Sequence, residues 1–286
     1  MARESHLYQA ILARRSVRRY DRTPLKEAKL AQVQEIVSGV KPLVPDNRFE
    51  VLMHNVSAVE DLVATLGGYG RIVSPPHYLV PYLIGTAHPL EDLGYRTEQI
   101  AVRLTRLGVG SCFIGSLSRE AAVRGRFSLP KEARVGAFLV FGLPSRALGN
   151  RAVDAMMRAA VGAANKLSTE RLFFRDTFET PTKPPPELAP LIEAARHAPS
   201  AVNAQPWRFL WHGEHLHLFV KGHNPKYGRG ATAYYRLFDG GICMANASLA
   251  LDALGMKGLW TMYEGTEPDI PPHPHQLQPM ARLDFE

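Results

Sequence analysis

The stretch LGYRTEQIAVRLTRLGVG, residues 93–110, recurs in weaker form as GGICMANASLALDALGMK, residues 240–257. Both copies place apolar residues at helical spacing and then reach a glycine, which commonly ends a helix because it adopts left-handed backbone without strain. A short strand is expected after each copy, so the recurrence predicts two related halves within one chain. The matching positions are Gly94 with Gly241, Leu104 with Leu251, and Leu107-Gly108 with Leu254-Gly255.

A second recurrence supports the first. The segments LAQVQEIV, residues 30–37, and LAPLIEAA, residues 188–195, both have the apolar spacing of amphipathic helices. Each runs into a proline-bearing turn and then a strand, RFEVLMH at residues 48–54 and WRFLWHG at residues 207–213. This order predicts an α+β fold made of two fused, weakly similar halves. Chance similarity between amphipathic helices is the alternative.

A proline-rich segment lies between the two halves. The residues DTFETPTKPPPELAP, residues 176–190, cannot continue a helix and are expected to form a stiff connector. The first half is then residues 1–175 and the second half residues 191–286. Further strands are expected near residues 137–141 and in a hairpin that turns at residues 212–214.

The composition is that of a globular protein, with 286 residues of which 45% are hydrophobic and 21% charged. No apolar run approaches the roughly 18 residues that cross a bilayer, and the N-terminus lacks an apolar signal core. A cytoplasmic protein without a membrane partner is therefore expected. Cys112 and Cys243 are expected to be reduced, buried thiols.

The charge raises the question of a nucleic-acid partner, because the formal net charge is +7 and the pI is about 9.5. The arginines are scattered, however, and no zinc-finger, RNA-recognition or basic-zipper pattern is present, so no nucleic-acid partner is expected. The histidine pairs His215 with His217 and His273 with His275 are not accompanied by acids or thiols in a metal-binding motif. No metal site is therefore expected.

One basic cluster stands apart in ARRSVRRY, residues 13–20. Arg14, Ser16 and Arg18 alternate along it, and in an extended segment alternate side chains share one face. Two guanidinium groups and a hydroxyl on one face suit a phosphate dianion. A solvated basic face is the alternative.

Two further segments offer contacts to a ligand. The turn APSAVNAQPW, residues 198–207, is restricted by its prolines and carries hydrogen-bonding side chains at Ser200, Asn203 and Gln205. Its alternative role is to cap its own backbone. The small residues of LGVGSCFIGSL, residues 107–117, let backbone amides approach a ligand closely, or simply end a helix and lead into a strand.

Together these three segments resemble the FMN-dependent nitroreductase family, which has an Arg-x-Ser-x-Lys/Arg segment, a Pro-Ser-x-x-Asn-x-Gln-Pro-Trp turn and a Leu-Gly stretch after a helix. Typical members are homodimers with FMN at the interface. One subunit holds the phosphate and one flavin face, and the other lends the turn. Here roughly 180 residues separate the arginine segment from the turn. The chain is therefore similar to a subgroup in which two nitroreductase-like halves are fused.

The resemblance also implies roles for single residues. Lys166 would join the arginines at the phosphate, Arg71 would lie near the flavin pyrimidine, and residues 114–116 would lie beside the hydride-accepting nitrogen. Some members carry glutamate where this chain has Gly115, so a side-chain role is lost there. No catalytic side chain is expected, because the flavin carries the chemistry. The cofactor-binding residues that the resemblance implies are Arg14, Ser16, Arg18, Arg71, Ile114, Gly115, Ser116, Lys166, Pro199, Ser200, Ala201 and Asn203.

The function that the resemblance implies is FMN-dependent hydride transfer from NAD(P)H to a nitroaromatic, a quinone or a similar small acceptor. Arg71 would stabilise the negative charge of the reduced flavin. The chain would act as a monomer that is its own internal pseudo-dimer. The alternative is an FMN-binding protein without steady-state turnover, serving as a flavin sensor or carrier.

Overall fold

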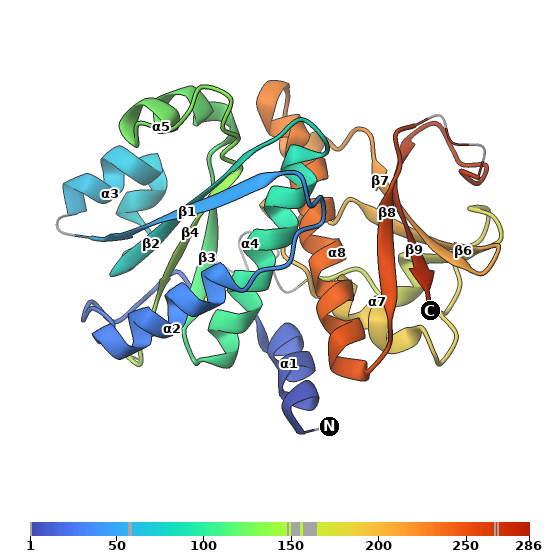
Figure 1. Ribbon diagram of the computed structural model, residues 1–286, viewed down its shortest axis with the longest axis horizontal. Helices are drawn as coiled ribbons and strands as arrows, with labels where there is room; N and C mark the ends of the chain where they lie inside the picture. Colours follow the sequence, from blue (N-terminus) through green and yellow to red (C-terminus); the bar gives the residue numbers. More distant parts are fainter. Residues whose placement is uncertain are drawn as a thin grey trace.

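Two β-sheets flank a central pair of helices in the computed structural model (Figure 1). The helices α4 (Pro89–Arg106) and α8 (Tyr235–Leu254) lie side by side, with the sheet of each half on its own side of the pair. The structure describes residues 2–56, 59–147, 149, 155–156, 165–265, 267 and 269–286. This arrangement confirms the expected α+β fold of two related halves.

The first half forms a four-stranded antiparallel sheet in the order β1-β2-β4-β3. Strand β4 is buried along its whole length, which explains its uninterrupted apolar sequence AFLVFG. The strands are β1 (Arg48–Asn55), β2 (His77–Ile84), β3 (Gly110–Gly115) and β4 (Ala137–Gly142). The helices are α1 (Ala2–Ala13), α2 (Glu27–Ser38), α3 (Val59–Leu66) and α5 (Glu120–Arg126).

The second half forms a five-stranded sheet in the order β5-β6-β7-β9-β8, with helix α7 (Ala189–Arg196) packed against α8. The short strand β5 pairs in parallel with β6, and Thr182 of the proline-rich connector donates a hydrogen bond to Phe173 O at 2.9 Å. The strand before the connector thus belongs to the second sheet, and the division of the chain at residues 176–190 stays a prediction. The strands are β5 (Phe173–Arg175), β6 (Trp207–His212), β7 (His215–Lys221), β8 (Gly258–Met262) and β9 (Leu277–Phe285).

The central helices cross at the two glycines that the sequence repeat aligns. A Cβ atom on Gly94 would lie 2.2 Å from Phe238 O, and one on Gly241 would lie 1.9 Å from Glu91 O. Real Cβ atoms do not approach backbone oxygen this closely, so glycine is required at both positions for the helices to touch. Because each glycine faces the residue three places before the other, the two contacts are related by an approximate two-fold symmetry.

The expected turns also occur. Helix α4 is followed by Gly108 with φ +73° and α8 by Gly255 with φ +68°, the left-handed conformation in which glycine commonly ends a helix. Strands β6 and β7 form the expected hairpin, and Gly213 and Glu214 between them both have positive φ, as two-residue hairpin turns require.

A shared core joins the two halves. One continuous apolar cluster includes Leu93 from α4, Leu191 from α7 and Met244 from α8. Cys112 and Cys243 are buried and free, as expected. The segment 230–254 is long and apolar enough to cross a membrane by composition, but 78% of its apolar window is buried inside the protein. Helix α8 is therefore a core helix of this fold.

Gly241→Ala is expected to lower the free energy of unfolding by about 1–3 kcal/mol, because its Cβ would force α4 and α8 apart. Gly125→Ala in α5 is the matched control, since a Cβ there meets nothing within 4 Å. The control should be neutral or slightly stabilising, because alanine favours helices more than glycine does. Urea unfolding measures the stability of both variants. Equal free energies of unfolding for Gly241→Ala and the parent would contradict a backbone contact at Gly241.

Candidate functional site

The arginine segment leaves α1 and runs beside β3. Val17 N–H donates to Ser111 O at 2.9 Å, and Ser16 forms a parallel bridge with Ser111. Arg14 is buried and Arg15 is exposed, but Val17 is also buried while Ser16 and Arg18 are half-buried, so a shared face for Arg14, Ser16 and Arg18 stays a prediction. The segment therefore places the Arg14 side chain inside the protein, so this guanidinium is not part of a solvated basic face.

Arg14 lies near two other charged side chains, the buried Glu98 and the half-buried Lys166. The family resemblance assigns Lys166 to the same phosphate as Arg14. Its Nε lies 3.4 Å from Glu98 Oε1 on α4, and Glu98 is fully buried. Lys166 is close enough to both groups for their charges to shift its pKa. Lys166 Nζ also donates to Ala198 O at 2.5 Å, which ties the first half's cations to the turn of the second half.

The turn at residues 198–205 directs much of its hydrogen bonding into the protein. Ser200 Oγ accepts from Gln205 N–H at 3.0 Å, and the Gln205 amide binds Asn165 O and Leu167 N–H. Asn203 Nδ2 donates to Asn165 O at 3.2 Å. Only the Ser200 contact caps the turn's own backbone, whereas the Asn203 and Gln205 side chains anchor the segment that carries Lys166.

The same turn holds an unusual backbone. Val202, Asn203 and Gln205 have φ of +48°, +52° and +48°. Positive φ is disfavoured for any residue with a Cβ and is a clear outlier for a β-branched valine. Such strain persists only where surrounding contacts enforce it, and it is concentrated at functional sites.

The first turns of α8 connect this turn to the end of β3. Asp239 Oδ2 accepts from Ala201 N–H at 2.9 Å and from the Tyr227 hydroxyl at 2.8 Å. One helical turn earlier, the Tyr235 hydroxyl accepts from Leu117 N–H at 3.1 Å. The structure therefore brings the second half's turn and the first half's residues 114–117 to the same end of one helix.

The stretch at residues 114–116 offers backbone rather than side chains. Ile114 is buried in the core, and Ser116 donates its amide to Gly136 O and its hydroxyl to Val135 O. Gly115 is exposed, and a Cβ there would lie 2.3 Å from the Tyr235 hydroxyl. The position of Tyr235 explains why a glycine stands where some related proteins carry glutamate.

The site spans the length of β3. Ser111 lies beside the arginine segment, and Gly115 ends the strand four residues later, so about 13 Å separate the two ends at ~3.3 Å per residue. A charged group could be held at one end and a flat ring at the other. The side chain of Arg71, expected near the ring, lies outside the described residues, although the Arg71 backbone ends the 3-10 turn Gly67–Arg71.

Burial dominates the electrostatics of this region. It raises the pKa of Asp239 to about 7, although the hydrogen bonds from Tyr227 and Ala201 and the charge of Lys166 lower it. It lowers the pKa of Lys166 to about 7, and the nearby Arg14 charge lowers it further while Glu98 raises it. The cluster can therefore gain or lose protons near neutral pH.

Sequence reasoning missed two features of this region. One is the buried carboxylate of Glu98, and the other is that Asp239 holds the turn of the second half through a backbone hydrogen bond, which no motif indicates. The repeat contains a signal for it, because Asp92 and Asp239 both lie two residues before the matched glycines. Asp92 accepts from Leu43 N–H at 2.9 Å, as Asp239 accepts from Ala201 N–H. For Glu98 the only sequence signal is that a charged residue occurs among the positions of α4 that are buried.

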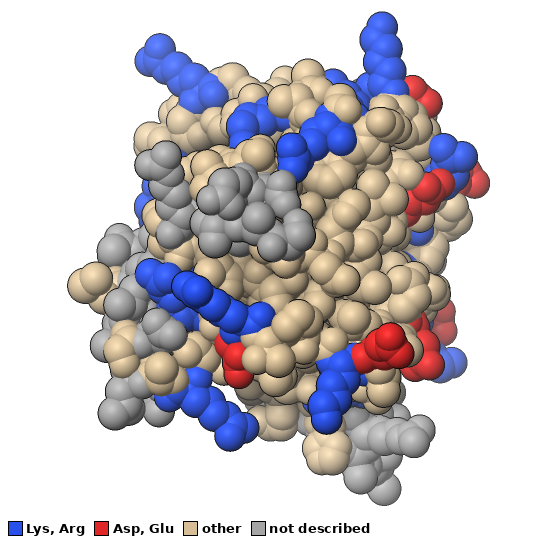
Figure 2. Space-filling view, turned by 90° about the vertical axis from the view of Figure 1, so that its left-hand side faces the viewer, with Lys and Arg blue, Asp and Glu red and all other residues tan. Residues whose placement is uncertain are grey.

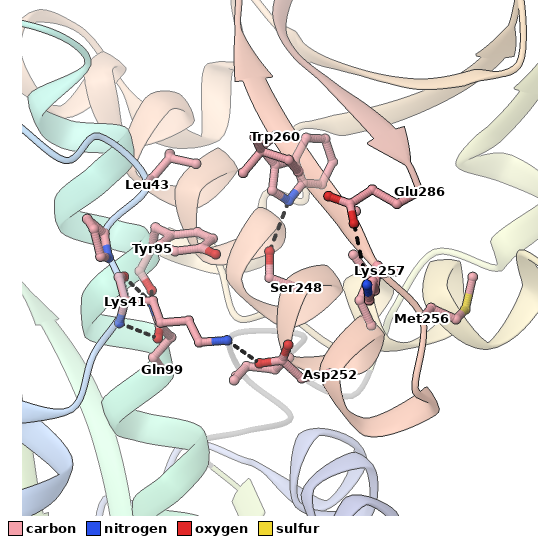
Figure 3. A pocket seen from close by; sticks show the side chains of 15 residues that line it. Lys41, Leu43, Tyr95, Gln99, Ser248, Asp252, Met256, Lys257, Trp260 and Glu286 are labelled. Atoms are coloured by element: carbon pink, nitrogen blue, oxygen red, sulfur yellow. Dashed lines mark hydrogen bonds and ion pairs between the residues drawn. The ribbon is translucent and has the colours of Figure 1, made fainter.

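A pocket of about 390 Å³ lies at the symmetry-related place, against the loop at residues 41–43 (Figure 3). Two lysines line it, and each has an acidic partner. Lys41 Nζ lies 2.9 Å from Asp252 Oδ2, and Lys257 Nζ lies 3.8 Å from Glu286 Oε2. The pocket and the Arg14 region therefore differ. The pocket is lined by lysines that are paired with carboxylates and, among the described residues, by no arginine, whereas the Arg14 region has a buried arginine near Lys166.

The basic side chains on the outer face of the first half do not gather into one stripe. Figure 2 shows the lysines and arginines described on this face spread among other residues. A nucleic-acid groove typically has a continuous basic surface. The basic side chains drawn on this face are dispersed, and they do not form such a surface where the structure describes it.

Comparison with known proteins gives the family. A family model described as putative TM nitroreductase matches residues 6–251. The chain belongs to this nitroreductase family. It is therefore an oxidoreductase of nitroreductase type. No curated protein matches the sequence.

Solved structures of nitroreductases are similar in fold. A putative nitroreductase from Thermotoga maritima has 20% sequence identity and a TM-score of 0.59, and the match covers 97% of this chain and 92% of that chain. An FMN-dependent nitroreductase from Clostridium difficile has 18% identity and a TM-score of 0.41 over 48% of this chain and 87% of that chain. The Thermotoga match extends across both halves, so the fold is shared over nearly the whole nitroreductase chain described here.

Asp239→Asn is expected to weaken the pH dependence of this nitroreductase's stability. The folded-state pKa of about 7 exceeds the ordinary value of 3.8, so the stability that Asp239 contributes is full below about pH 4 and is lost as pH rises toward 7. Asparagine keeps an acceptor for Ala201 N–H and cannot ionise. The fall in unfolding free energy between about pH 4 and 7 should therefore be smaller in the variant.

Asp239→Ala is the control, because it leaves Ala201 N–H and the Tyr227 hydroxyl without their acceptor. This variant should be about 1–3 kcal/mol less stable than Asp239→Asn across the whole pH range, because neither side chain ionises and only asparagine keeps an acceptor. Denaturant titrations at several pH values measure both effects. A parent-like pH dependence in the asparagine variant would show that Asp239 does not titrate in this range.

Proposed function

We propose that this nitroreductase binds one FMN between its halves and passes hydride from NAD(P)H to a small acceptor such as a nitroaromatic or a quinone. The observation that carries the proposal is the buried guanidinium of Arg14, which lies beside Lys166 and next to the turn of the second half. Buried cations without sufficient partners are costly, so this arrangement is expected to serve an anionic ligand.

The residues present fit the phosphate group of FMN. Within the described chain, Arg14 Nε and Nη1 and the Ser111 hydroxyl are buried without a hydrogen-bond partner. All three can donate hydrogen bonds, and phosphate oxygens only accept when ionised. Arg14 and Lys166 would hold the phosphate, with Ser16 and Arg18 from the same segment as Arg14.

The other residues would orient the flavin and exclude water. When bound, FMN would supply the hydride chemistry. The exposed backbone at Gly115 allows a flat ring to approach closely, and Tyr235 keeps that backbone in place through Leu117. Pro199, Ser200, Ala201 and Asn203 would cover the ring from the second half, and Arg71 would offset the negative charge of the reduced flavin.

A flavin-binding protein without turnover is the second candidate. The hydrogen bonds of Ser116 and of the turn at residues 198–205 are directed into the protein, which leaves few side chains to position a second substrate. Steady-state oxidation of NAD(P)H with a quinone or nitroaromatic separates the two. Flavin reduction without turnover would favour the sensor or carrier.

Arg14→Ala combined with Arg18→Ala is expected to weaken FMN binding by roughly two to four powers of ten. Each charged phosphate contact contributes about 1.5–3 kcal/mol. The double variant Arg15→Ala with Arg22→Ala removes the same charge from two exposed positions nearby and should bind like the parent. Fluorescence titration of FMN measures both. An unchanged dissociation constant in the first variant would place the phosphate elsewhere.

One FMN per chain is expected, in a chain that needs no second copy. Only the first half carries the arginine segment, and only the second carries the Pro-Ser-x-x-Asn turn. At the symmetry-related pocket both lining lysines already pair with carboxylates, so a phosphate there would lack an available cation among the lining residues. Flavin released on denaturation, measured against protein concentration, gives the stoichiometry, and sedimentation gives the oligomeric state. Two flavins per chain would contradict the half-site argument.

A further inference from the structure

Glu98 is a buried carboxylate at the centre of the cationic cluster. It lies on the inward face of α4, and none of its surface is exposed. Within the described chain neither of its oxygens has a hydrogen-bond partner, and Oε1 lies 3.4 Å from Arg14 Nε in an ion pair. A carboxylate buried in this way normally has several donors, because removing it from water is costly.

The charged groups that act on Glu98 come from two other segments of the chain. Arg14 approaches from the end of α1 and Lys166 from the segment that the turn anchors. Asp239 and Cys243 on α8 lie close enough to Lys166 to influence its pKa. An ionised Glu98 therefore offsets one of the two cations proposed to bind the phosphate, and it would lie beside a second anion if the phosphate were bound.

We propose that Glu98 makes phosphate binding depend on proton uptake: the ionised carboxylate pairs with Arg14 in the free protein, and it takes up a proton when the phosphate monoester of the flavin binds there. The protonated acid no longer repels the ligand, and its O–H can donate a hydrogen bond to a phosphate oxygen. Arg14 exchanges one anionic partner for another. This inference rests on the proposed function, since it assumes that the cluster holds the FMN phosphate.

The proton balance sets the direction of the pH effect. Burial raises the pKa of Glu98 to about 7, against the opposing charges of Arg14 and Lys166. A bound phosphate dianion would raise this pKa further, since a nearby like charge disfavours ionisation. Below pH 7 Glu98 holds its proton in both states, so it adds no pH dependence. Above pH 7 Glu98 and Lys166 both take up protons when phosphate binds, so affinity falls as pH rises, and the Glu98 share is the part that Glu98→Gln removes.

The experiment compares FMN with riboflavin, which has the same ring but no phosphate, in the parent and in Glu98→Gln. The ratio of the two affinities isolates the phosphate contact from any general effect on the fold. In the parent this ratio should fall between about pH 6 and pH 9. In Glu98→Gln it should be about tenfold or more above the parent's at pH 9, and close to the parent's at pH 6.

Two controls keep the outcomes separate. Glu193→Gln on α7 removes a carboxylate whose pKa its partner Arg196 lowers, so its ratio should follow the parent's at each pH. Calorimetry at pH 9, in buffers of different ionisation enthalpy, measures the number of protons taken up when FMN binds. Glu98→Gln should take up fewer protons per FMN than the parent.

The overturning results are also distinct. A strong preference for FMN that neither pH nor Glu98→Gln changes would overturn the role of Glu98 and leave the proposed function intact. Equal affinity for FMN and riboflavin in the parent at pH 6 would overturn the proposed phosphate site itself.

Discussion

The backbone contact between α4 and α8 is the constraint on which the rest of the structure depends. Gly94 faces Phe238 O and Gly241 faces Glu91 O, so the two helices touch without side chains between them. Tyr235 and Asp239 extend from the first turns of α8, and their hydrogen bonds reach Leu117 in the first half and Ala201 in the second. A wider crossing would separate the motifs that these two residues hold together.

Close packing of the halves also explains the behaviour of the buried charges. Arg14, Glu98 and Lys166 come from three different segments and lie in a region of low dielectric, where unpaired charges are costly and pKa values shift strongly. Burial moves the pKa values of Glu98 and Lys166 toward neutrality from opposite directions. A ligand that adds charge to such a cluster shifts these pKa values again, so its binding is coupled to protons at pH values where the groups titrate.

Fusion of the halves permits an asymmetry that a symmetric dimer does not have. The related aspartates Asp92 and Asp239 both hold the turn before a strand, which preserves the common framework. Their surroundings differ, because Asp92 is paired with Arg96 while Asp239 is bound by the Tyr227 hydroxyl. The region around Arg14 thus has a buried arginine near Lys166. The symmetry-related pocket has two lysines, each paired with a carboxylate.

The sequence by itself determined the two-half plan, the central helices α4 and α8, the helices α2 and α7, several strands and the hairpin, because apolar periodicity and glycine or proline positions act locally. It did not predict β2, β9, α3 or α5. It also identified Arg14, Lys166 and the turn at residues 198–205 as candidates, through motifs. Only the tertiary structure decided that Glu98 meets Arg14, that Tyr235 fills the space at Gly115, and that the Ser200 and Asn203 side chains turn inward. These pairings join residues far apart in the chain, and their geometry depends on how closely two helices pack, which no local pattern encodes.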